Sequence, residues 1–325
     1  MPRRARNGHT HSRIVQPTQR ETNYDAKQHA KAIVLIAGIV SYDRPESLER
    51  LLRTVQVVGV FGAVVVVCDA SSKNLYDRYM NLAIRYGRLG DFVVKLGKRG
   101  SAAARNVLFD YVSRNYLDND VLVMLDDDYE LDSKESLFVV KEHLSNMNIG
   151  IVGGKLIPRR YHRIDPDFRL ELLPAAADVL SQLTGFVFLD CRHGPRFVRY
   201  TTPLMAIKVR LLRNGIRYDG FYVGSAYREE SDLQAQTVAA GWTIVFDPRF
   251  RAYDYAEAKG GNRSFSLVQR FYYKARNNAR FQMKFHPLLS LLLSQLIIQL
   301  YALRYGIWTF ISAARGFREG LLSRR

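Results

Sequence analysis

The sequence predicts an α/β fold in which a mostly parallel sheet is flanked by helices. Continuous runs of Val, Ile and Leu, such as the four valines at 64–67, are typical of strands that are buried on both faces. Segments with helical spacing of apolar residues separate these runs, and this alternation favours a sheet sandwiched by helices. Ligands bind such sheets beyond the carboxyl ends of the strands, so polar residues at those ends are candidates for a site.

The first half of the chain supplies most of the predicted elements. The third helix begins after Gly100, and Ser101 is its candidate N-cap. In chain order we expect a strand over 32–40, a helix over 46–58, a strand over 63–72, a helix over 76–87, a strand over 91–97, a helix over 101–115 and a strand over 120–131.

The second half is less regular. Strands are expected over 150–158, 197–209 and 241–253, with a helix around Ser231 to Ala240 and another from Ser266. Three parts follow from this pattern. Residues 1–30 form a disordered basic tail, residues 31–285 the α/β domain, and residues 286–325 an apolar and basic C-terminal helical segment.

Charge and cysteine content narrow the class of protein. The net charge is +17 over 325 residues, and twelve Lys or Arg but one acid lie between Lys259 and the C-terminus. This excess predicts a polyanionic partner: nucleic acid, anionic lipid or a phosphorylated substrate. Cys68 and Cys191 are too far apart in sequence for a CxxC metal site and indicate free thiols in a reducing compartment. The first apolar run reads as a strand rather than a signal-peptide core, so we expect a cytoplasmic protein.

Three adjacent carboxylates, Asp126, Asp127 and Asp128, follow a predicted buried strand. Like charges at close range oppose ionisation, and a divalent cation such as Mg²⁺ or Mn²⁺ relieves that conflict. A solvated acidic turn is the alternative, but the position at a strand end favours a site.

Two other groups of residues have a chemical and a structural interpretation. Glu229, Glu230 and Asp232 precede a helix, where acids either interact with the helix dipole or act as a general base. Arg99 and Arg105 flank a helix start of small residues, which suits a diphosphate, although both are also compatible with a solvated helix face.

The remaining candidates follow the first two strands. Asp69 comes directly after the valine run, and Ser41, Tyr42 and Asp43 follow the first strand. A carboxylate such as Asp69 can accept hydrogen bonds from a base or ribose, or it can cap a turn.

Short motifs occur in a fixed order along the chain. They are S-Y-D-R at 41–44, V-C-D-A-S at 67–71, G-S-A-A-A-R-N at 100–106, D-D-D at 126–128, G-G at 153–154, E-E-S-D-L at 229–233 and R-N at 276–277. Each is weak alone, but their order and spacing resemble the family 2 glycosyltransferases, which have the Rossmann-like GT-A fold. The resemblance covers about residues 33 to 285.

The resemblance implies roles for these residues. Asp69 and the loop from Ser41 to Asp43 would contact the nucleotide, and Arg105, with Arg99 and Asp127, would lie near the donor. Asp126 would face the ribose or the metal, Asp128 would bind Mn²⁺ or Mg²⁺, and Glu230 would be the general base. The expected donor is a nucleoside-diphosphate sugar, with UDP or dTDP as the nucleotide. The acceptor would be a glycan or a lipid-linked molecule.

The sequence departs from the family pattern at four places. Cys68 stands where the first Asp of the second motif is usual, Glu230 replaces the usual Asp base, and Gln236 replaces an Arg. Asp254 is the candidate metal ligand where many members have a His.

The C-terminal segment suggests a membrane. Leu288 to Leu303 carries no charge, but the run is shorter than the roughly 20 apolar residues that span a bilayer. We expect a helix that lies on the inner face of the cell membrane, with packing against the domain or a subunit, and a true span past Arg304, as alternatives.

Other functions compete with glycosyl transfer. The basic charge is compatible with a nucleic-acid-binding protein, although the acids at the expected cleft argue against a polyanion there. A nucleotidyltransferase would use similar metal and nucleotide chemistry. Cys68 and Asp254 are also compatible with a catalytically degenerate relative. The sequence indicates no oligomeric state.

Overall fold

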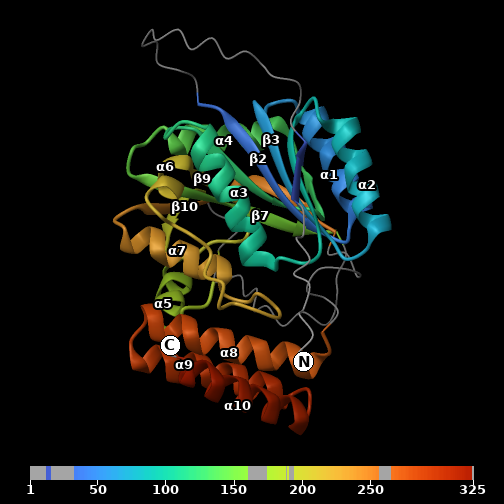
Figure 1. Cartoon of the computed structure of the whole chain (residues 1–325). Helices are drawn as coiled ribbons and strands as arrows, with labels where there is room; N and C mark the ends of the chain where they lie inside the picture. The colour runs from blue at the N-terminus through green and yellow to red at the C-terminus, as the bar shows by residue number, and fades with distance from the viewer. Residues whose placement is uncertain are drawn as a thin grey trace, which may run out of the picture.

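The computed structural model describes residues 12–15, 33–159, 174–187, 189, 194–255 and 265–323. A mixed sheet forms its centre, with helices on both faces (Figure 1). The strands are β1 (Ser12–Val15), β2 (Leu35–Tyr42), β3 (Ala63–Ala70), β4 (Gly90–Leu96), β5 (Val121–Asp126), β6 (Tyr129–Leu131), β7 (Ile149–Pro158), β8 (Arg196–Val198), β9 (Met205–Lys208) and β10 (Thr243–Asp254). The helices are α1 (Pro45–Val58), α2 (Lys73–Tyr86), α3 (Ser101–Asn115), α4 (Lys134–Leu144), α5 (Pro174–Thr184), α6 (Val209–Arg213), α7 (Glu229–Ala239), α8 (Leu267–Phe285), α9 (Leu288–Leu303) and α10 (Ile307–Leu322).

The strands lie in the order β1-β4-β3-β2-β5-β9-β7-β10-β6, and β8 pairs with β10. The part β4-β3-β2-β5 is parallel, as the sequence predicts, and β7 is parallel to β10. β9 runs antiparallel between β5 and β7, while β1, β6 and β8 also pair antiparallel. The sheet is therefore mixed, which corrects the mostly parallel expectation. Hydrophobic runs predict strands, but they do not set strand direction, and β9 follows β7 in the chain only after α5 and β8.

Two predicted strands are each divided into two. The segment 120–131 forms β5 and β6, with Asp127 and Asp128 in the turn between them. The segment 197–209 forms β8 and β9. Within the basic tail expected over 1–30, Ser12–Val15 pairs with β4 as β1, and the other residues of that tail lie outside the described part.

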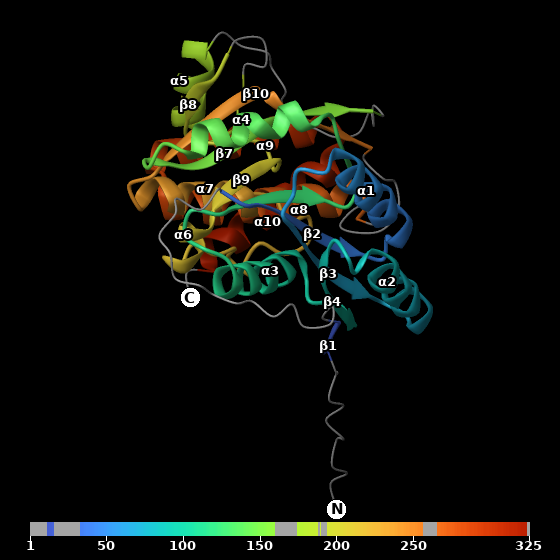
Figure 2. The ribbon, with the colours of Figure 1, turned by 90° about the horizontal axis from the view of Figure 1, so that it is seen from above.

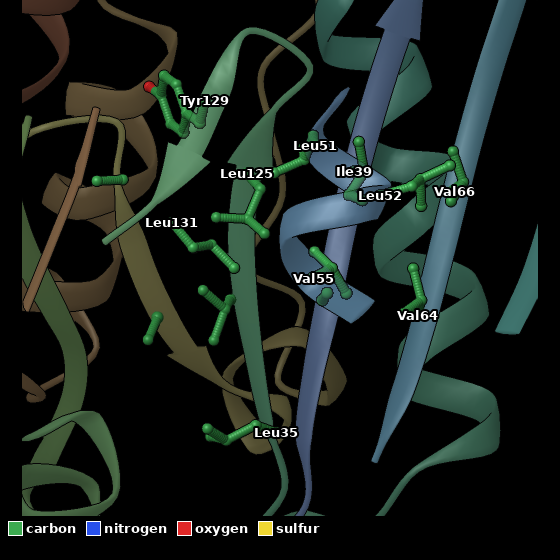
Figure 3. Close-up of a cluster of buried hydrophobic side chains, with 14 of the residues drawn as sticks. Leu35, Ile39, Leu51, Leu52, Val55, Val64, Val66, Leu125, Tyr129 and Leu131 are labelled. Carbon is green, nitrogen blue, oxygen red and sulfur yellow. The ribbon is translucent and has the colours of Figure 1, made fainter. Parts of the chain in front are cut away.

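The core fills both faces of the sheet. Successive residues of a strand point to opposite sides. On one side Ile39 and Val66 pack against Leu52 of α1 (Figure 3). On the other, Val65 packs with Leu108 of α3. Figure 2 accordingly shows α1 and α2 on one side of the strands and α3 on the other. This arrangement leaves the carboxyl ends of β2, β3 and β5 at one edge.

The C-terminal segment forms α9 and α10, which pack with α8 as a layer of three helices at one end of the molecule (Figure 1). Gly306, with a φ of 109°, separates α9 from α10, so the apolar run does not continue as one element past Arg304. Gly316 brings α10 close to α8, because a Cβ there would lie 2.1 Å from the Tyr272 carbonyl oxygen. Among the described residues, no helix has the length and apolar character needed to cross a membrane.

Candidate functional site

The acidic turn after β5 is held by Ser41, near the end of β2, and by Arg44, just beyond it. Ser41 donates from Oγ to Asp127 Oδ2 at 2.7 Å. Arg44 Nη1 lies 3.0 Å from Asp127 Oδ1 and 3.3 Å from Asp128 Oδ2. Burial raises the pKa of Asp127 to about 7, although Arg44 opposes that rise. Asp126 differs from its two neighbours, because 39% of its side chain is exposed.

The loop after β2 is shaped to present Arg44. Asp43 has a φ of 57°, which turns the chain sharply, and its Oδ1 accepts a hydrogen bond from the Ser71 amide at 2.8 Å. The Tyr79 hydroxyl lies 2.7 Å from Ser41 Oγ and accepts from the Arg44 amide at 2.8 Å. The structure thus places Ser41 and Asp43 as supports of the acidic turn and of the neighbouring loop.

A second centre of charge forms around Arg105 on α3, which is 8% exposed. Its Nη2 lies 3.0 Å from Asp126 Oδ1, and its Nη1 contacts Glu229 Oε1 and lies 2.8 Å from Glu230 Oε1. Ser101 donates from Oγ to Glu229 at 2.7 Å. Gly100, with a φ of 94°, takes the N-cap position expected for Ser101, which frees the serine hydroxyl for this bond.

Burial changes the acidity of both glutamates. It raises the pKa of Glu229 to about 8 and also raises that of Glu230, while the charge of Arg105 opposes both shifts. Glu230 keeps 21% of its side chain exposed, whereas Glu229 keeps 1%. Of the two carboxylates, Glu230 is therefore the one that a bound molecule can reach.

The pKa of the Tyr129 hydroxyl reflects the charges of several of the predicted acidic residues. Its pKa is raised well above the usual value by burial and then by the charges of Asp126, Asp254, Asp128 and Glu230. Asp254 pairs with Tyr129 in the β6–β10 ladder, so the predicted metal ligand lies beside the acidic turn. Carboxylates from β5, the β5–β6 turn, β10 and α7 therefore all act on the pKa of one buried phenol.

The donor set fits a hard cation whose other ligands come from a diphosphate. Among the described residues, no three His, Cys, Asp or Glu side chains are grouped to hold a metal ion by themselves. Mg²⁺ and Mn²⁺ sites commonly use one or two carboxylates and complete the shell with phosphate and water. Asp126 and Asp128 supply such a pair, and Arg44 and Arg105 neutralise these carboxylates in the structure described here.

The predicted nucleotide side lies at the ends of β3 and β4. Asp69 is 3% exposed, and it accepts from the Arg99 amide at 2.6 Å and from Arg99 Nη1 at 2.5 Å. Burial raises the pKa of Asp69, and these bonds to Arg99 oppose the rise. Lys98 Nζ lies 5.0 Å from the ring centre of Tyr42. Asp69, Arg99 and Tyr42 are thus gathered at one edge, next to the loop that holds Asp43.

Asp232 is separated from the other predicted catalytic residues by its contacts. It is fully buried, and its Oδ2 accepts from the Tyr222 hydroxyl at 2.7 Å and from Lys284 Nζ at 2.6 Å. Gln236 also donates to it. These contacts tie α7 to α8, and a structural role accounts for Asp232.

The sequence indicates no place in the site for Arg44, Tyr79, Tyr129 or Lys284, and it indicates Ser101 only as a helix N-cap. In the structure all five contact or surround the predicted residues. Arg44 belongs to the S-Y-D-R motif, so its position was a usable signal. Tyr79 and Lys284 lie within ordinary helical patterns, and no sequence feature separates them from other helix residues.

Solved structures share this fold. A mannosyltransferase from Pyrobaculum calidifontis, solved with GDP-Man and Mn²⁺, matches with a TM-score of 0.56 at 14% identity, over 91% of this chain and 77% of that one. TarS 1–349 from S. aureus, solved with UDP-GlcNAc, matches with a TM-score of 0.57 at 12% identity, over 89% and 82%. GalNAc-T7, solved with UDP, GalNAc and Mn²⁺, matches with a TM-score of 0.57 at 15% identity, over 90% of this chain and 55% of that one.

No family model and no curated protein matches the sequence. At these identities the structural matches establish a fold of the GT-A kind and nothing finer, so membership of family 2 stays a prediction.

Proposed function

We propose that this chain is an inverting glycosyltransferase, which moves a sugar from a nucleoside-diphosphate sugar to an acceptor hydroxyl. The observation that supports it most is the contact set of Arg105, which joins Asp126 at the end of β5 to Glu229 and Glu230 at the start of α7. The fold shared with three solved glycosyltransferases supports the same reaction class.

In this reaction Glu230 takes the proton of the acceptor hydroxyl. The acceptor oxygen then bonds to the anomeric carbon as the bond to the diphosphate breaks, and the nucleoside diphosphate leaves with that electron pair. A carboxylate with a raised pKa is a stronger base, which suits this role. Arg105 fixes the direction of the Glu230 carboxylate. A single displacement by the acceptor, with no covalent intermediate, inverts the configuration at the anomeric carbon.

The donor would lie between the two centres of charge. Asp69, Arg99 and Tyr42 would face the nucleotide, and Asp126 and Asp128, with Asp254 beside them, would hold Mn²⁺ or Mg²⁺. Bound metal would stabilise the negative charge that develops on the leaving diphosphate. We further propose UDP or dTDP as the nucleotide and a lipid-linked or cell-envelope glycan as the acceptor, at the cytoplasmic side of a membrane.

Thermal stabilisation by nucleotides tests the donor site. The melting temperature would be measured with UDP, dTDP, GDP and ADP, with and without Mn²⁺, in the wild type, in Asp128→Ala and in Asp110→Ala, a control acid on α3. We expect a Mn²⁺-dependent rise for one nucleotide in the wild type and the control, and its loss in Asp128→Ala. No rise with any nucleotide would contradict the proposal and favour the degenerate relative.

Product analysis then separates the reaction classes. Once the nucleotide is identified, the protein would be incubated with a panel of sugars linked to that nucleotide and with extracts that contain candidate acceptors. Release of the free nucleoside diphosphate is the expected result. Release of pyrophosphate from a nucleoside triphosphate and a sugar phosphate would instead show a nucleotidyltransferase.

A further inference from the structure

The outer face of α9 carries a stripe of exposed leucines. Six leucines lie along it, and each is between 49% and 69% exposed; from the second onward they recur every three or four residues, about one helical turn. They are Leu288, Leu289, Leu292, Leu296, Leu300 and Leu303, which we call the leucine face. Single exposed leucines are ordinary on a protein surface, but a continuous stripe marks a surface that contacts something other than water.

The buried face of the same helix carries polar residues. Ser290, Ser294 and Gln295 are at most 5% exposed, and Ser294 accepts a hydrogen bond from Asn278 Nδ2 on α8 at 2.9 Å. A helix on the surface of a soluble domain normally turns its apolar stripe to the core and its polar residues to water. α9 buries three polar residues beside Leu291, Ile298 and Ala302 and leaves six leucines exposed, so its outer side is adapted to an apolar medium.

The apolar surface continues beyond α9. Ile307 and Trp308, at the start of α10, are 55% and 73% exposed. Exposed Trp at the edge of an apolar surface is typical of the interface between lipid headgroups and acyl chains, where its ring is half solvated. Figure 1 shows α9 and α10 at the end of the molecule farthest from the sheet.

The charge around this face distinguishes between two partners that it could bind, a second copy of the chain and a lipid surface. Twelve Lys or Arg and one acid lie between Lys259 and the C-terminus. That acid, Glu319, already binds Arg276 at 2.9 Å and Tyr272. Arg304, Arg315 and Arg318 are exposed on or beside α10. A second copy of the chain would bring two basic surfaces together, whereas anionic lipid complements this charge.

We propose that the leucine face, with Ile307 and Trp308, docks in the plane of an anionic lipid bilayer. The leucines would enter the boundary between headgroups and acyl chains, and the arginines around α10 would meet the lipid phosphates. This inference does not depend on the proposed enzymatic activity.

Vesicle flotation of the full chain tests the proposal. Vesicles of phosphatidylcholine alone and of phosphatidylcholine with phosphatidylglycerol would be compared at low and high salt. The apolar variant combines Leu292→Ser, Leu296→Ser and Leu300→Ser. Its matched control combines Val57→Ser and Ile84→Ser, exposed apolar residues on α1 and α2. We expect the wild type and the control to float with the anionic vesicles and the apolar variant to bind at least about tenfold less.

The charge contribution has its own pair of variants. Arg304→Glu with Arg315→Glu should reduce binding to the anionic vesicles by about tenfold or more, while Arg88→Glu with Arg114→Glu, exposed arginines elsewhere, should bind as the wild type does. In a Trp242→Phe background, Trp308 emission should shift to the blue when anionic vesicles are added. Circular dichroism would confirm that each variant is folded.

Three outcomes would overturn the proposal. The wild type could stay unbound to anionic vesicles at low salt, or the Val57 and Ile84 control could lose as much binding as the apolar variant. Light scattering could also show a dimer that the apolar variant converts to a monomer without any vesicle binding. That result would make the leucine face a subunit interface.

Discussion

Arg105 Nη1 lies 2.8 Å from Glu230 Oε1, although 125 positions separate the two residues in the chain. The same guanidinium contacts Asp126, so one buried cation connects the end of β5 to the start of α7. The geometry of the proposed site therefore depends on a tertiary contact between α3 and α7 rather than on any local motif.

Removal of Arg105 should destabilise the protein strongly. Arg105→Ala leaves the buried Glu229 and the partly exposed Glu230 without their counter-charge, which typically costs about 3 kcal/mol in the free energy of unfolding. Urea unfolding at neutral pH measures the loss. Adding Glu229→Gln to Arg105→Ala should recover part of it, because it removes one buried acid. As the control, Lys73→Ala breaks an exposed ion pair with Asp77 and should cause no measurable loss of stability. If the effects of Arg105→Ala and Glu229→Gln on the free energy of unfolding were simply additive, the two residues would not be coupled.

Glu230→Gln should separate catalysis from donor binding. The amide is nearly isosteric but takes no proton, so turnover should fall by about 10²- to 10⁴-fold while the nucleotide-dependent thermal shift remains. The matched variant is Asp232→Asn. It should lower stability by about 3 kcal/mol through the lost pair with Lys284, and its folded fraction should retain most of its turnover. Equal loss of turnover in the two variants would contradict the assignment of Glu230 as base.

The buried guanidinium of Arg228, immediately before Glu229, has neutral acceptors. Nε and Nη2 bind Asn278 Oδ1 at 3.1 and 2.8 Å, and Nη1 binds the Gly185 carbonyl at 2.6 Å. Asn278→Ala should therefore cost about 2 kcal/mol in the free energy of unfolding, because it removes hydrogen bonds to a buried charge. Asn115→Ala, at an exposed site on α3, is the control and should change little. Equal unfolding midpoints for the two variants would argue against this role of Asn278.

Gly316→Ala should loosen the contact between α10 and α8. The added Cβ would meet the Tyr272 carbonyl oxygen, and overpacking of this kind costs about 2 kcal/mol. Gly220→Ala is the matched control, since a Cβ there meets nothing within 4 Å and the residue is not in the left-handed region. Thermal unfolding of both variants checks this. A melting temperature of Gly316→Ala equal to that of the control would show that the two helices can separate without cost.

His286 should make stability depend on pH below neutrality. Burial lowers its folded-state pKa from 6.5 to about 4, and its Nε2 lies 2.7 Å from the Tyr200 hydroxyl. The unfolded state therefore binds more protons between these values, so this contribution is present above pH 6.5 and is lost as the pH falls towards 4. The stability of the wild type relative to His286→Gln should decline over that interval in urea unfolding. Tyr200→Phe keeps the imidazole and should show the same decline as the wild type, whereas a constant difference between wild type and His286→Gln would contradict the shift.

The sequence by itself determined most elements of the first half, although it did not indicate α4. It also named Asp126 and Glu230, which the structure joins through Arg105. The valine run at 64–67 lies within β3 because only a strand buried on both faces tolerates such a continuous apolar segment. The acidic residues begin at Asp126, the last residue of β5, and Asp127 and Asp128 form the buried turn that follows it. The order of short motifs also indicated the fold that the solved structures share.

Tertiary structure alone decided strand direction, charge pairing and the role of each acid. β9 enters the sheet antiparallel after a long connection, and no local pattern encodes that direction. Glu230 and Asp232 are two positions apart on one helix, yet Glu230 faces Arg105 and Asp232 faces Lys284. Hydrophobic periodicity reports which residues are buried, whereas the partner of a buried charge depends on which distant element supplies its counter-charge. α9 shows the same limit, because only its packing on α8 and α10 reveals that Ser290 and Ser294 lie inside while six of its leucines lie outside.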